Sequence, residues 1–151
     1  MNSYAISLGL HLAAGTLALA CFWVAAGARK GSRWHVLAGR TYMAAMLGVI
    51  LSGAPLAHAL VERGQQISAL FLCFLLLLTG SACWRAWRAI RDRQQPARYF
   101  GALFWVFAIA VGAGGAGMLW LGLQTGAVLL QVFGGVGLLA SYGGVQSWRR
   151  A

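Results

Sequence analysis

Acidic side chains are almost absent from this sequence. Of its 151 residues only two are acidic, Glu62 and Asp92, and both lie between the long apolar stretches. Proton- and cation-coupled transporters usually depend on Asp or Glu inside the membrane, so the sequence disfavours that class. Hydrolytic sites built on a Ser-His-Asp set or on a bound metal are equally unsupported. The sequence therefore predicts no catalytic residues and no metal site.

Cysteine and charge in general are also scarce. The three cysteines have no CxxC or zinc-type spacing, so we expect them to be small apolar packing residues. Charged residues make up 9% of the chain, whereas soluble domains contain about 25%. With 60% hydrophobic residues and a mean hydropathy of +0.72, the chain cannot bury its apolar surface in water. Its solvent is expected to be lipid.

What the sequence does contain is a series of long apolar runs, each near the roughly 20 residues that a membrane-spanning helix needs. The expected spans are 4–28, 36–60, 67–84, 99–121 and 125–147. We predict an all-α bundle of five transmembrane helices that forms a single domain over residues 1–151. The stretch 84–93 is expected to continue the third helix beyond its span.

Small residues recur along the last two spans. Ala108, Gly112 and Ala116 follow one another at i, i+4 and i+8, and Gly137 and Ser141 do the same in the last span. Lipid supplies no hydrophobic drive between helices, so contact depends on small residues that let the backbones approach. We therefore expect these two helices to pack closely.

The basic residues lie on alternating connections. Eleven of the twelve Lys and Arg side chains lie in the first connection, near the start of the second span, in the third connection or in the C-terminal tail. Only Arg63 lies on the opposite side. The positive-inside bias predicts an external N-terminus and a cytoplasmic C-terminus. Because the cations form short clusters between apolar runs, we expect no nucleic-acid partner.

The connection "RKGSRWH" contains the densest group of cations. Gly31 is expected to permit a tight turn there. His35 either orders this turn or meets lipid headgroups. The residues predicted to contact anionic headgroups or a protein partner are Arg29, Lys30, Arg33, His35, Arg85 and Arg88. A second copy of the chain and another membrane subunit both stay open as the partner.

Two further histidines, His11 and His58, are expected at similar depth near the external side, on antiparallel neighbouring helices. Paired neutral imidazoles on bundle helices can hold haem iron, so His11 and His58 are the candidate cofactor ligands. The alternative for His11 is a neutral imidazole bonded to a backbone carbonyl. For His58 the alternative is an ordinary interfacial residue.

One pattern resembles a known family. It reads His11–x3–Gly15, then Lys30–Gly31–x3–His35–x3–Gly39–x2–Tyr42–x3–Met46. It is similar to a family of small bacterial multi-spanning membrane proteins catalogued as a domain of unknown function, and the likeness covers residues 8–95. The resemblance points to His11, Lys30, His35 and Gly39, and it implies no substrate. Together with the predicted topology, it implies a multi-pass protein of the cytoplasmic (inner) membrane of a bacterium. Relatives often have a histidine before the fourth span, but "DRQQPARYFG" lacks it, so no role is carried over to that stretch.

The sequence thus leaves two function classes. It favours a non-catalytic membrane or accessory component with a cationic cytoplasmic face, because membrane topology already accounts for every polar feature except the histidines. The alternative is a small b-type haem or quinone redox protein that uses His11 and His58.

Overall fold

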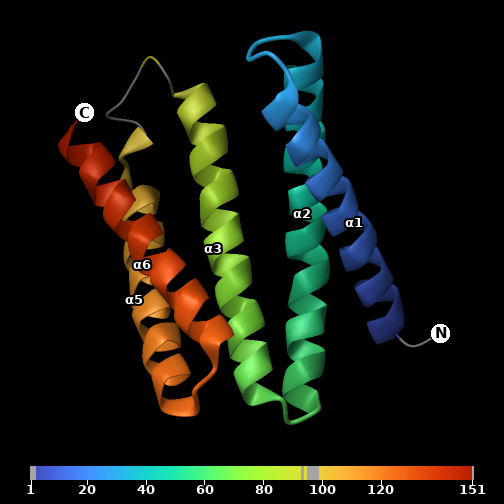
Figure 1. Cartoon of the computed structure of the whole chain (residues 1–151), viewed down its shortest axis with the longest axis vertical. Coiled ribbons are helices and arrows are strands. Elements are labelled where there is room, and N and C mark those ends of the chain that lie inside the picture. The colour runs from blue at the N-terminus through green and yellow to red at the C-terminus, as the bar shows by residue number, and fades with distance from the viewer. Residues whose placement is uncertain (1–2, 93, 95–98, 151) are drawn as a thin grey trace. The chain divides into compact units, whose positions relative to one another are not determined.

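The computed structural model describes residues 3–92, 94 and 99–150. Within them lie five α-helices, each long and apolar enough to cross a membrane (Figure 1). They are α1 (Ser3–Gly27), α2 (Arg33–Glu62), α3 (Gln66–Arg91), α5 (Ala102–Thr125) and α6 (Val128–Arg149). The predicted all-α, multi-span class is confirmed. The expected extension of the third helix is confirmed as far as Arg91, whereas Arg93 and Arg98 lie outside the described residues.

The chain divides into two compact units, Met1–Leu72 and Cys73–Ala151, and the boundary falls within α3. Each unit is described by itself. The prediction of a single domain stays a prediction.

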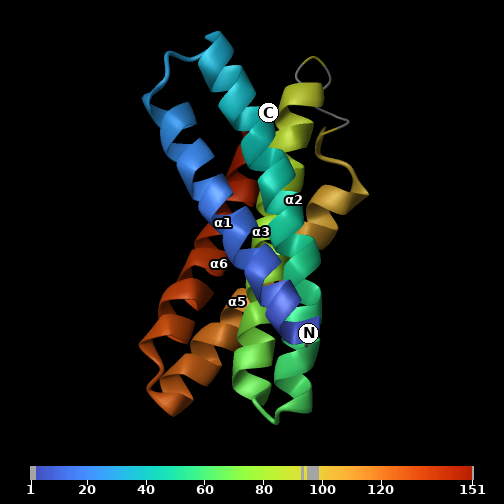
Figure 2. The same ribbon diagram turned by 90° about the vertical axis from the view of Figure 1, so that its right-hand side faces the viewer.

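In the first unit α1 lies against α2 (Figure 2). The two helices approach closely where small residues meet, because a Cβ added at Gly48 would lie 3.3 Å from the Cβ of Ala14. Near the start of α1, the guanidinium carbon of Arg63 lies 3.8 Å from the centroid of the Tyr4 ring. This cation–π contact ties the first turn of α1 to the end of α2. The single cation predicted on the external side therefore has a packing role.

In the second unit α5 and α6 pack through small residues. The hydroxyl of Ser141 donates a hydrogen bond of 2.8 Å to the backbone oxygen of Ala108, and Gly112 lies beside Ser141. The predicted close packing is confirmed at these positions. Ala116, however, is exposed, and the buried Gly115 contacts α6 in its place. The expected i, i+4, i+8 stripe was wrong at that step because the contact line between the helices turns away from it.

The part of α3 that belongs to this unit, from Cys73 on, contacts both other helices through one buried ring. Phe74 is 4% exposed. A Cβ added at Gly114 of α5 would lie 3.0 Å from this ring, and one added at Gly137 of α6 would lie 2.7 Å from it. The phenyl group thus occupies the space that two glycines leave, which fixes α3 against the α5–α6 pair.

Candidate functional site

The turn between α1 and α2 is tightly ordered by its own residues. The backbone nitrogen of Ser32 donates to the oxygen of Arg29 at 2.9 Å. Gly31 has a φ of +83°, a left-handed conformation that glycine adopts without strain, as the sequence predicted. The Ser32 hydroxyl accepts a hydrogen bond of 3.2 Å from the backbone nitrogen of His35 and caps the start of α2.

The imidazole of His35 caps the other helix of this turn. Its Nδ1 lies 2.9 Å from the backbone oxygen of Ala25, near the end of α1. A carbonyl can only accept, so Nδ1 is the protonated nitrogen. The last carbonyls of a helix have no partner within it, and His35 satisfies one of them. This contact favours the interpretation in which His35 orders the turn.

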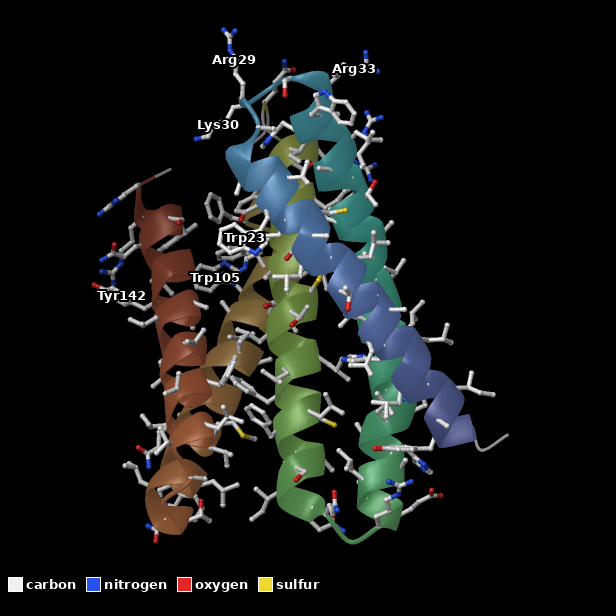
Figure 3. The ribbon with its side chains drawn as sticks, turned by 45° about the vertical axis from the view of Figure 1, so that its right-hand side comes forward. Trp23, Arg29, Lys30, Arg33, Trp105 and Tyr142 are labelled. Carbon is white, nitrogen blue, oxygen red and sulfur yellow. The ribbon has the colours of Figure 1, made fainter. Side chains whose placement is uncertain are left out.

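The charged side chains of the turn take no part in these bonds. Arg29, Lys30 and Arg33 are exposed and project away from the helices (Figure 3). We call these three residues the turn cluster. The two acidic residues of the sequence lie beside other partners in the described chain. Glu62 lies 3.7 Å from His58, and Asp92 pairs with Arg88. The charge of the turn cluster is therefore directed outward.

His11 takes part in a short hydrogen-bonded chain between α1 and α2. Its Nδ1 lies 3.1 Å from the hydroxyl of Ser52, and that hydroxyl lies 2.7 Å from the backbone oxygen of Gly48. The carbonyl must accept, so the serine hydrogen points to Gly48 and His11 donates to the serine oxygen. His11 faces a helix, as expected. Its partner is the Ser52 hydroxyl and not the backbone carbonyl that was the expected alternative.

His58 does not take part in this series of hydrogen bonds. The His58 side chain is 75% exposed and lies beside Glu62, one turn further along α2. Ser52 and His58 are six residues apart, which places them about 120° apart around the helix. His11 is thus held on one face of α2 while His58 lies on another. The haem or quinone hypothesis stays a prediction.

An absorption spectrum tests that hypothesis. If His11 and His58 bind haem, protein purified from haem-replete cells shows a Soret band and a reduced-state α-band. Both bands should disappear in His11→Ala and in His58→Ala, because each variant removes one axial ligand, whereas Cys21→Ala should retain them. A colourless preparation would contradict the hypothesis.

The two predicted contact residues of α3 have different surroundings. Arg88 pairs with Asp92, and its guanidinium carbon lies 5.4 Å from the centroid of the Trp84 ring. Arg85 is half-buried and donates from Nη1 to the backbone oxygen of Ala140 at 3.2 Å. It also lines a cavity of about 460 Å³ within the second unit. No spacing in the sequence links Arg85 to the other residues of this cavity.

The chain was also compared with protein-family models, with curated proteins and with solved structures. The resemblance drawn from residues 8–95 stays a prediction. None of the three comparisons gives a match.

Proposed function

We propose that the protein is a non-catalytic component of a bacterial inner membrane whose turn cluster binds anionic lipid headgroups on the cytoplasmic side. The observation that supports this proposal is that different residues of the turn hold its structure and carry its charge. Ser32 and His35 form the bonds that hold the two helix ends. Arg29, Lys30 and Arg33 are left exposed.

Topology supports the cytoplasmic assignment. Of the nine other basic residues in the sequence, eight lie near the start of α2, in the last turns of α3 or after it, or at the end of the last helix, and only Arg63 follows the far end of α2. If all five helices cross the bilayer, these eight lie on the same side as the turn. Anionic lipid at that surface attracts each nearby Lys or Arg by about 1 kcal/mol. Exposed charges are screened within about 8 Å at physiological ionic strength, so the attraction should fall as salt is added.

Lipid selectivity measured by spin-label electron paramagnetic resonance tests the proposal. We expect the reconstituted protein to select spin-labelled phosphatidylglycerol over spin-labelled phosphatidylcholine. In a variant with Arg29→Gln, Lys30→Gln and Arg33→Gln the relative association constant should fall clearly toward unity, because the exposed charge of the turn is removed while Ser32 and His35 are retained. High salt should lower the wild-type selectivity in the same direction.

The matched control removes exposed cations from the tail. Arg149 and Arg150 are exposed like the turn cluster, and their double replacement by Gln should reduce selectivity less. An equal loss in this control would contradict the assignment to the turn cluster. A wild-type protein without preference for the anionic lipid would contradict the proposed function itself.

A further inference from the structure

The cavity beside Arg85 lies within the unit formed by Cys73–Ala151. Its wall is made by the last turns of α3, the beginning of α5 with Tyr99 before it, and the second half of α6. These helix ends lie at the same end of the unit (Figure 1). At about 460 Å³ the cavity has room for a phosphate group and part of its attached glycerol.

Among the described residues of the cavity wall, Arg85 alone is charged. A guanidinium has five N–H donors, and the structure gives Arg85 one bond, to the backbone oxygen of Ala140. Within the described chain, Asp92 pairs with Arg88 and Glu62 lies beside His58 in the other unit. A half-buried cation without a carboxylate partner is stabilised when an anion approaches it.

Two adjacent glycines of α6 shape the space around this guanidinium. A Cβ added at Gly144 would lie 3.4 Å from Nη1 of Arg85, so the guanidinium lies directly against the α6 backbone. Gly143 is exposed, and a Cβ added there would have nothing within 4 Å. The cavity is thus open beside Gly143. The nearby Ser147 hydroxyl already donates to the backbone oxygen of Gly143 at 2.8 Å.

The surrounding aromatic residues indicate the depth of the cavity in a membrane. Trp105 and Trp148 form an edge-to-face pair with centroids 5.3 Å apart, and Trp87 lies 4.9 Å from the guanidinium carbon of Arg91. Figure 3 shows Trp105 and Tyr142 toward this end of their helices. Trp, Tyr and Arg gather at headgroup level, where the phosphates of phospholipids lie.

We propose that this cavity binds the phosphate of one anionic phospholipid, with the Arg85 guanidinium as its principal partner. The planar fork of arginine matches two phosphate oxygens at once. Tyr99 lines the same space. This inference rests on the proposed function, because it requires this end of the unit to face the anionic leaflet. It deepens that function by adding one discrete lipid site to the diffuse attraction of the turn cluster.

Phosphatidylglycerol titrated into the purified full-length protein in detergent tests the site. Native mass spectrometry counts the retained lipid, and the thermal unfolding midpoint reports its stabilising effect. We expect one retained lipid in the wild type and about tenfold weaker binding in Arg85→Gln, the loss typical of charge-assisted hydrogen bonds. Arg85→Lys should fall in between, because it retains the charge and loses the planar fork.

A second pair of variants changes the space and leaves the arginine in place. Gly143→Leu should fill the open side of the cavity and weaken lipid binding as Arg85→Gln does. Gly135→Leu is its matched control, because Gly135 lies on the same helix, outside the cavity, and its Cβ would also have nothing within 4 Å. This control should bind the lipid like the wild type. Unchanged binding in both Arg85→Gln and Gly143→Leu would overturn the proposal.

Two further measurements distinguish a phospholipid from free phosphate as the ligand, and the cavity from the turn cluster as the binding site. Excess inorganic phosphate should not displace the retained lipid; displacement would assign the site to free phosphate and overturn the lipid assignment. The variant without the turn cluster should lose its general selectivity and keep the retained lipid. If Arg85→Gln keeps the lipid while the turn-cluster variant loses selectivity, this inference fails and the proposed function stands. If only Arg85→Gln has an effect, the turn-cluster proposal fails and the cavity stands.

Discussion

Replacing Gly134 by alanine is expected to separate α5 from α6 and to destabilise the protein strongly. A Cβ at this position would lie 2.5 Å from the backbone nitrogen of Leu119 and 2.8 Å from the backbone oxygen of Gly115. Both are main-chain atoms of α5, so no side chain can rotate to relieve the clash. Overpacking of this kind costs about 1–3 kcal/mol or more, and lipid gives no hydrophobic compensation when the helices move apart.

Gly135→Ala is the matched control for this change. The added Cβ would have nothing within 4 Å, and alanine favours a helix over glycine by up to about 1 kcal/mol. Thermal unfolding of the detergent-solubilised variants should show a clear fall in the midpoint for Gly134→Ala and an unchanged or raised midpoint for Gly135→Ala. Equal midpoints for the two variants would contradict the α5–α6 contact described above.

Neutralising the turn cluster is expected to disturb the orientation of the first two helices. In the wild type, reporter fusions in residues 29–35 and after residue 151 should behave as cytoplasmic, and a fusion in residues 62–66 should behave as external. With Arg29, Lys30 and Arg33 all changed to Gln, the first connection loses most of the charge that retains it on the cytoplasmic side. The reporter in residues 62–66 should then show a mixed location or a low level of membrane protein.

The orientation experiment has its own control. Replacing Arg149 and Arg150 by Gln removes cations from the other end of the chain and should leave the first connection cytoplasmic. An active external reporter after residue 151 in the wild type would contradict the predicted orientation. An unchanged orientation in the turn-cluster variant would show that these cations do not determine topology.

The helices were predictable because lipid leaves the backbone little choice. Every buried N–H and C=O must be satisfied within the helix, so apolar length alone predicts five helices. The positions of the helix ends were harder to predict from the sequence, as α2 shows. It begins at Arg33 and not at residue 36, because Ser32 caps it. Hydropathy marks where the membrane begins, whereas capping marks where the helix begins.

The candidate sites were less predictable, because they depend on the axial position and rotation of one helix relative to its neighbour. Helical spacing indicated that His11 faces a neighbour, but its bond to Ser52 follows from the contact between Ala14 and Gly48, which fixes the height of α1 on α2. The surroundings of Arg85 come from parts of the chain that are far apart in sequence. The residue pattern within one segment cannot predict contacts between such distant segments.

The α5–α6 pair has a further consequence for how the chain is made. From Ala102 to Trp148 the sequence has no charged residue, and the two helices are joined through Gly126, whose φ of +69° permits an abrupt reversal. During biogenesis the loop of this hairpin can cross the bilayer without dehydrating a single ion, so its passage has a low barrier. The hairpin itself therefore has no preferred orientation. The arginines on either side of it determine the orientation, because they keep both ends of the hairpin on the cytoplasmic side.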